Sequence, residues 1–235
     1  NKIFATKSIF ADYSINQTDT VRPLVSAISA NNIKGTIEKL SSFKNRYYKS
    51  QTGVDSQKFV KETWEGLVKG RSDAKVEFFN HQSWSQPSVI LTIEGSKSPN
   101  EVIIIGGHAD SIAGYFGGAN ARAPGADDNA SGISTITEVV RVLVEGNYQP
   151  EKTLKFMGYA AEEVGLRGSK EIAQSFKANG TNVIAVMQLD MTNFNGSDLD
   201  IVMMTDYTNA DQNAFIGKII DEYVTGVSWG YDKCG

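Results

Sequence analysis

Four ionisable residues in this chain have the types and the spacing of a metal site. They are His108, Asp128, Glu163 and Asp190, which offer one imidazole and three carboxylates. If they lie together, they concentrate negative charge, which is unfavourable unless a cation lies among them. A divalent metal ion is the simplest cation with these ligand preferences.

Two further acids, Asp110 and Glu162, could assist such a metal. Asp110 follows His108 by two positions, on the same side of an extended segment, so it can orient the imidazole through the ring nitrogen that faces away from the metal. Glu162 and Glu163 are neighbours whose side chains diverge. One of them can therefore bind the metal while the other stays free to act as a base on a metal-bound water.

Each candidate also has an ordinary structural explanation when it is taken alone. Asp128 could cap a helix, Glu162 and Glu163 could form a solvated first helical turn, and Asp190 could cap a turn. A single histidine after a strand, such as His108, is more often structural than catalytic. The second histidine, His81, lies in a polar stretch and is expected at the surface.

The pattern around these residues predicts an α/β fold. Short apolar, β-branched runs alternate with segments of helical length from residue 88 onward, and several runs are continuous enough for a sheet covered on both faces. The expected strands are 88–93, 101–105, 153–158, 182–189 and 200–204. The expected helices are 32–40, 56–68, 131–145, 164–178 and 211–224.

Three of these strands end beside the candidate residues. Strand 101–105 runs into His108, strand 153–158 into Glu162 and Glu163, and strand 182–189 into Asp190. Ligands bind at the carboxyl ends of the strands in open α/β sheets, so these side chains are expected at one edge. Asp128 lies in a Gly- and Asp-rich loop that opens into a helix over the same edge.

Length and composition describe an ordinary globular chain. With 235 residues, 40% hydrophobic and 21% charged, a single domain over residues 1–235 is expected, with residues 1–32 as an extension or covering segment. The net charge of −4 makes nucleic acid an unlikely partner by charge alone. The longest apolar runs fall short of the roughly 18 residues that cross a membrane. The single cysteine, Cys234, is either free or paired outside this sequence.

Four motifs, in order, resemble the zinc-dependent aminopeptidases of the M28 peptidase family, in particular secreted bacterial leucyl aminopeptidases of Vibrio and Aeromonas type. The resemblance runs from about residue 35 to residue 235. The motifs are GGHADS at 106–111, APGADDNASG at 123–132, YAAEEVGLRGS at 159–169 and QLDMT at 188–192.

The resemblance implies a role for each candidate. Two zinc ions are implied, bridged by Asp128, with His108 and Asp190 completing one site and Glu163 binding the other ion. Glu162 would be the general base and Asp110 would orient the histidine. The resemblance also implies that the peptide bond after Asp128 is cis and that Met191 lies in the substrate pocket.

The implied protein is a secreted, monomeric aminopeptidase with a three-layer fold, a mixed, mostly parallel sheet and helices on both faces. It would remove large apolar N-terminal residues from peptides with a free N-terminus, through a water that bridges the two ions. The family takes its last zinc ligand, a histidine, and a second cysteine from a later segment. The sequence is therefore expected to be a fragment with an incomplete second site, and its own activity is left open.

Two alternatives remain at this point. One is a one-zinc acyltransferase of the glutaminyl cyclase type, which uses the same fold. The other is a catalytically silent interaction domain. The presence of both Glu162 and Glu163 speaks against the silent domain, because Glu162 has no evident role in folding.

Overall fold

The computed structural model describes residues 13–234, which belong to two compact units. The larger unit is Ile28–Asn193, and the smaller combines the chain up to Ala27 with the segment from Phe194 onward. The expected extension 1–32 lies partly outside the described residues, and the expectation of a single domain stays a prediction.

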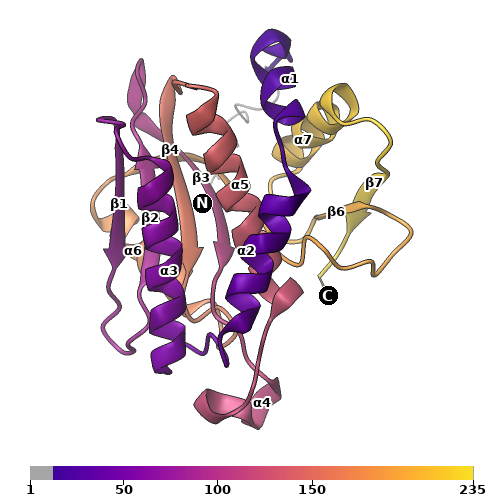
Figure 1. The fold of residues 1–235 in the computed structure, drawn as a ribbon. Helices are drawn as coiled ribbons and strands as arrows, with labels where there is room; N and C mark the ends of the chain where they lie inside the picture. The colour runs from indigo at the N-terminus through magenta and orange to yellow at the C-terminus, as the bar shows by residue number, and fades with distance from the viewer. Residues whose placement is uncertain (1–12, 235) are drawn as a thin grey trace, which may run out of the picture. The chain divides into compact units, whose positions relative to one another are not determined.

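A five-stranded mixed sheet forms the centre of the larger unit (Figure 1). Its order is β1-β2-β4-β3-β5, and β2 alone runs against the direction shared by the other four strands. This confirms the expected mixed, mostly parallel sheet. The strands are β1 (Ala74–Phe79), β2 (Ser88–Ile93), β3 (Ser98–His108), β4 (Lys152–Tyr159) and β5 (Asn182–Gln188).

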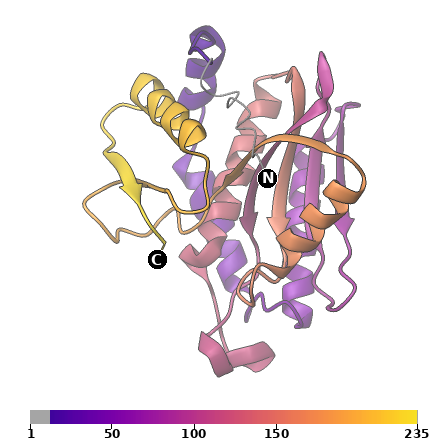
Figure 2. The same cartoon turned by 180° about the vertical axis from the view of Figure 1, so that it is seen from behind.

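Helices cover both faces of this sheet, as expected. Three of them, α2 (Ala30–Ser42), α3 (Gln51–Leu67) and α5 (Gly132–Glu145), lie on one face. Helix α6 (Arg167–Ala178) lies on the other face, as Figure 2 shows from behind. The short helix α4 (Gly114–Gly117) and the turn η3 (Ala126–Ser131) belong to the connection between β3 and α5.

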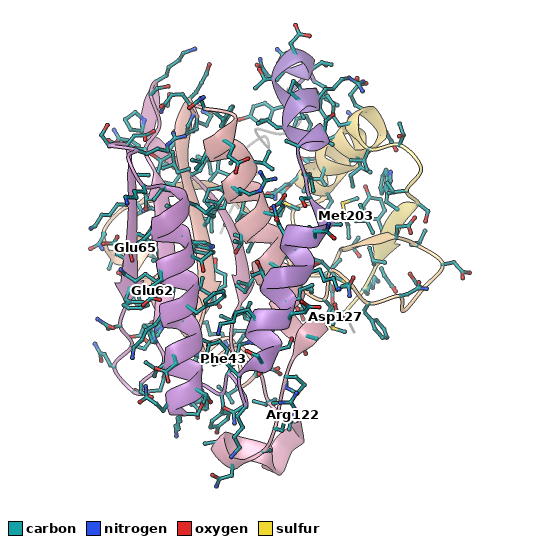
Figure 3. The ribbon with its side chains drawn as sticks, in the orientation of Figure 1. Phe43, Glu62, Glu65, Arg122, Asp127 and Met203 are labelled. Atoms are coloured by element: carbon teal, nitrogen blue, oxygen red, sulfur yellow. The ribbon has the colours of Figure 1, made fainter. Side chains whose placement is uncertain are left out.

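The core of the larger unit follows from the amphipathic helices and the apolar strands. Trp64 of α3 and Ile133 of α5 are fully buried against the strands. Glu62 and Glu65 of α3 are exposed and project from the opposite side of the helix (Figure 3). This division between an apolar and a charged face is what places α3 on the sheet.

The smaller unit is built on a β–α–β arrangement. Strands β6 (Ile201–Met204) and β7 (Trp229–Asp232) pair in parallel, and α7 (Ala210–Tyr223) connects them. Helix α1 (Thr18–Ser26) belongs to the same unit, where Arg22 binds Glu222. Cys234 is exposed and free.

The strands and helices expected from residue 30 onward are present, with small shifts at their ends. Helices α1 and α4 and strands β1 and β7 were not expected from the sequence. In the part of the chain that the structure describes, no helix is both long and apolar enough to cross a membrane.

Candidate metal centre

The candidate residues gather at the carboxyl ends of three parallel strands. His108 is the last residue of β3, Glu162 and Glu163 follow the end of β4, and Asp190 lies two residues beyond β5. Asp128 lies in η3, directly before α5. The predicted edge is confirmed, because neighbouring parallel strands bring their carboxyl ends together.

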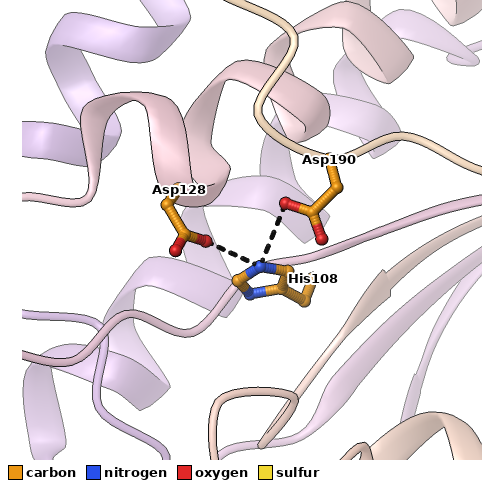
Figure 4. A group of neighbouring side chains, drawn as sticks. All are labelled: His108, Asp128 and Asp190. Atoms are coloured by element: carbon orange, nitrogen blue, oxygen red, sulfur yellow. Dashed lines mark ion pairs between the residues drawn. The ribbon is translucent and has the colours of Figure 1, made fainter. Parts of the chain in front are cut away.

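The imidazole of His108 faces two carboxylates through one nitrogen (Figure 4). Its Nε2 lies 2.9 Å from Asp128 Oδ1 and 3.5 Å from Asp190 Oδ1. One ligand atom from each of these three residues lies within 4.8 Å of the others. The histidine side chain is 1% exposed, whereas those of Asp128 and Asp190 are 47% and 42% exposed. The histidine side of the group is therefore buried, whereas the side formed by the two aspartates is open to solvent.

The electrostatics of this group call for a cation. Although burial opposes the charged form, hydrogen bonds with Asp110, Asp128 and Asp190 raise the pKa of His108 to about 12. Burial, together with the nearby carboxylate of Asp128, raises the pKa of Glu163 to about 7. An imidazolium thus holds the positive charge that the carboxylates need. A divalent ion would replace that proton, and an imidazole nitrogen with carboxylate oxygens is a donor set that zinc accepts.

Asp110 connects the histidine to the two glutamates. Its carboxylate is fully buried, and His108 Nδ1 lies 3.2 Å from the backbone carbonyl oxygen of Asp110 and 3.5 Å from its Oδ1. The same carboxylate accepts hydrogen bonds from the backbone N–H groups of Glu162, at 2.9 Å, and Glu163, at 3.2 Å. It therefore lies behind the histidine, as predicted, and it also fixes the backbone that carries both glutamates.

The loops that carry Asp128 and Asp190 are joined by side chains of η3. Asn129 donates to the carbonyl of Leu189 and accepts from the N–H of Met191, the two neighbours of Asp190. The approach is close at the start of α5, where a Cβ at Gly132 would lie 2.7 Å from the Leu189 carbonyl oxygen. These contacts hold the two aspartates on the same side of His108.

The peptide bond between Asp128 and Asn129 is cis, which confirms that expectation. Glu162 lies close to the group, with Oε2 3.8 Å from His108 Nε2. Glu163 is not part of the three-residue group, although it lies near enough to Asp128 for the two charges to interact. Met191 is 44% exposed beside Asp190, and its role in a substrate pocket stays a prediction.

Two residues that support the site were missed in the sequence analysis. Asn129 lies in the motif at 123–132, so the sequence indicated its place near the site but not the hydrogen bonds that it makes. Arg46, which is fully buried beside the loops of His108 and Asp128, carried no signal, because its partners are backbone carbonyls far along the chain.

The expectation that His81 lies at the surface is wrong. His81 is buried, with Nδ1 2.8 Å from Glu171 Oε2 and Nε2 2.8 Å from Ser88 Oγ. This order of serine, histidine and acid resembles a hydrolytic triad. Ser88 is fully buried, however, and its Oγ accepts the N–H of Ala160, so it cannot meet a substrate. The cluster links β2 and α6 to the end of β4.

Comparison with known proteins places this chain among peptidases. The sequence profile of "Peptidase family M28" matches residues 88–228, which include every candidate metal ligand. The chain belongs to peptidase family M28. Where the sequence resemblance narrowed this to Vibrio and Aeromonas enzymes, the narrower assignment stays a prediction.

Alignments with two curated relatives cover most of this chain. It is 37% identical to a "Probable leucine aminopeptidase" of Arthroderma benhamiae over 226 residues, which cover 94% of this chain and 61% of the relative. It is 38% identical to "Leucine aminopeptidase 1" of Trichoderma harzianum, covering 96% of this chain and 58% of the relative. The chain thus spans about 60% of the length of the curated relatives it matches.

Two solved structures share the fold of this chain. The Legionella pneumophila LapA aminopeptidase superposes with a TM-score of 0.89 at 32% identity, over all of this chain and 61% of that one. A zinc aminopeptidase from Bacillus subtilis superposes with a TM-score of 0.71 at 13% identity, over 88% of this chain and 80% of that one. The second likeness concerns the fold alone, and both place this chain in the zinc exopeptidase fold class.

Proposed function

We propose that this chain carries the metal centre and the general base of a zinc-dependent aminopeptidase. The observation that carries the proposal is the buried His108, whose Nε2 faces the carboxylates of Asp128 and Asp190 at an otherwise open edge. The leucine aminopeptidases among its relatives support the choice of reaction.

Three residues would hold the first zinc ion, namely His108, Asp128 and Asp190. We propose a second ion that shares Asp128 and takes Glu163 as a further ligand. The raised pKa of Glu163 supports this arrangement, because a carboxylate buried beside other carboxylates becomes more favourable when a cation joins it. Asp110 would fix the ring of His108 and the backbone of both glutamates.

Glu162 is proposed as the general base. Its carboxylate lies beside the metal group but is not among the three ligands that meet there, so it stays free to take a proton from water and give it to the leaving amine. Bound zinc would supply Lewis acidity, which lowers the pKa of water and polarises the scissile carbonyl.

The proposed substrates are peptides with a free N-terminus and a large apolar first residue. Met191, half exposed beside Asp190, is the residue of this chain that we propose for contact with that side chain. We also propose, from the sequence resemblance, that the protein acts outside the cell and as a monomer. Its recovery from the culture medium and its mass in solution test these two points.

A paired assay of the full-length protein tests the reaction. A leucyl peptide with a free N-terminus should be hydrolysed, and the same peptide with an acetylated N-terminus should not. Removal of metal by a chelator should abolish hydrolysis, and added zinc should restore it. Equal cleavage of both peptides, or cleavage that survives complete metal removal, would contradict the proposal.

A third peptide separates the cyclase alternative from the peptidase. A peptide beginning with glutamine should lose that residue as free glutamine if the protein is an aminopeptidase. Loss of ammonia with formation of pyroglutamate, and no peptide hydrolysis, would assign the glutaminyl cyclase type of reaction instead.

A further inference from the structure

A single arginine joins the loops that carry His108 and Asp128. Arg46 is fully buried in the larger unit, and its guanidinium donates to four backbone carbonyls. Nε donates to Ala109, at 2.8 Å, and Nη2 to Gly125, also at 2.8 Å. Nη1 donates to Pro124 and Leu40.

The acceptors of these bonds lie next to metal ligands. Ala109 stands between His108 and Asp110, whereas Pro124 and Gly125 directly precede η3, which carries Asp128. One planar side chain therefore spans both ligand segments, which are otherwise separated by α4 and its connection.

Four further hydrogen bonds of the same region tighten this link. The backbone N–H of Arg46 donates to Ser111 Oγ at 3.0 Å, and that hydroxyl donates to the carbonyl of Ala123 at 2.8 Å. Asn45 Nδ2 donates to the carbonyls of Ala119 and Ala121. Each of these bonds connects residues that are 12 or more positions apart in the chain.

We infer that Arg46 is a positioning residue, which sets the separation of His108 and Asp128 and thereby the zinc affinity of the centre. The inference rests on the metal part of the proposed function. Arg46 itself does not bind the metal, because its guanidinium has only donors, and these are directed at carbonyl oxygens.

The geometry at Arg46 needs arginine in particular. A guanidinium offers five donors in a rigid plane, whereas the ammonium group of lysine is a compact point charge. The neighbouring turn is shaped for this contact, since a Cβ at Gly125 would lie 2.7 Å from Arg46 Nη2. Lysine would keep the charge but could not span the two segments in the same way.

The charge of Arg46 has an effect opposite to that of its hydrogen bonds. Burial lowers its pKa to about 10, so it remains a cation at neutral pH, near the carboxylates of Asp110, Asp128 and Glu163. A nearby positive charge repels a zinc ion. If charge were its main effect, a neutral residue here would increase zinc affinity, whereas loss of positioning would decrease it.

The test is a zinc titration of the metal-free full-length protein, with a fluorescent chelator as competitor, for wild type, Arg46→Lys and Arg46→Met. Both variants should bind zinc about 10–100-fold more weakly, the usual range for loss of an outer partner of a ligand. The cobalt-loaded variants should also show a changed visible absorption spectrum, which reports ligand geometry directly.

Arg71 provides a matched control in the same unit. It donates to the carbonyl of Tyr148, 77 positions away, and pairs with Asp73 near the start of β1, far from the carboxyl ends of β3 and β4. Arg71→Met should lower the unfolding temperature of the protein while its zinc affinity stays that of wild type. This separates positioning of the metal ligands from general destabilisation.

Should both Arg46 variants fail to fold, Ser111→Ala tests the same link more mildly, and it should weaken zinc binding by a smaller factor. Wild-type zinc affinity in the folded Arg46 and Ser111 variants, or tighter binding by Arg46→Met, would overturn the inference while leaving the metal centre intact. Absence of zinc binding by wild type would instead refute the proposed function.

Discussion

The two histidines of the chain are both buried and both paired with an acid, yet their surroundings differ in kind. His108 is 1% exposed and its Nε2 faces carboxylates from two separate loops. His81 is 8% exposed, with one carboxylate, that of Glu171, on one nitrogen and the hydroxyl of Ser88 on the other.

The difference shows in the charge that each site favours. Burial lowers the pKa of His81, and one carboxylate does not offset it, so the neutral ring is stable there. Around His108 several carboxylates outweigh burial and raise the pKa to about 12. Burial and an acidic partner are therefore not enough to indicate a metal ligand. Several carboxylates that converge on one ring nitrogen are the more specific signal.

The largest difference between the two clusters should appear in catalysis. We expect Glu162→Ala to lower turnover of a leucyl peptide by roughly 10²–10⁴-fold, the range for loss of a positioned acid or base. Its zinc content should not change, because Glu162 is not among the three converging ligands. The measurement is steady-state kinetics together with elemental analysis.

Glu171→Ala is the matched control, since it removes the acid beside the other histidine. Turnover should stay close to that of wild type. Wild-type turnover by the Glu162→Ala protein would contradict the assignment of Glu162 as the general base.

The next largest effect should come from the acid behind His108. Asp110→Asn should weaken zinc binding by about 10–100-fold, because an amide orients the imidazole less well than a carboxylate does. It should also disturb the backbone of Glu162 and Glu163, because their N–H groups donate hydrogen bonds to the Asp110 carboxylate. Competition with a chelator measures the affinity, and an unchanged value would show that the buried carboxylate serves folding alone.

A smaller effect, on stability rather than metal binding, is expected at the other histidine. His81→Leu leaves Glu171 and Ser88 without their ring partner, and loss of such a buried hydrogen bond costs about 1–3 kcal/mol. Urea denaturation should show this decrease in the free energy of unfolding. A loss of zinc affinity in the same variant would mean that the two clusters are coupled.

The smallest expected effect is a pH dependence that arises from His81. Its pKa in the folded protein is lowered, so the unfolded chain takes up the proton first as pH falls below the usual histidine pKa of about 6.5. Wild type should therefore lose stability below that pH relative to His81→Leu. The difference between the two proteins removes the contribution of the other titrating groups, and a difference that is constant with pH would contradict the assignment.

Much of the larger unit could be predicted, because strands β2, β3 and β5 contain nearly continuous apolar runs. Strand β1 could not, since Lys75 and Glu77 interrupt its apolar residues and, among residues 13–234, it pairs with β2 alone. The metal ligands could be placed because each follows a strand or opens a helix. Their convergence follows from the parallel order of the sheet.

The supporting residues could not be predicted for a different reason. Arg46 binds backbone carbonyls that lie 63 and 79 positions away, and a carbonyl is present at every residue, so no side-chain type marks the partner. The acid beside His81 lies 90 positions away, on α6, and only the fold brings them together. The polar stretch around His81 suggested exposure, whereas packing against Phe79 and Trp84 buries the ring.

The most direct test of the metal centre is the zinc content and zinc affinity of three full-length proteins: wild type, His108→Ala and His81→Ala. We predict that wild type and His81→Ala bind zinc equally, while His108→Ala loses more affinity than the roughly 10–100-fold typical of an outer partner. Elemental analysis and chelator competition give both quantities. Zinc binding by His108→Ala that equals wild type would contradict the assignment of this edge of the sheet as the metal centre.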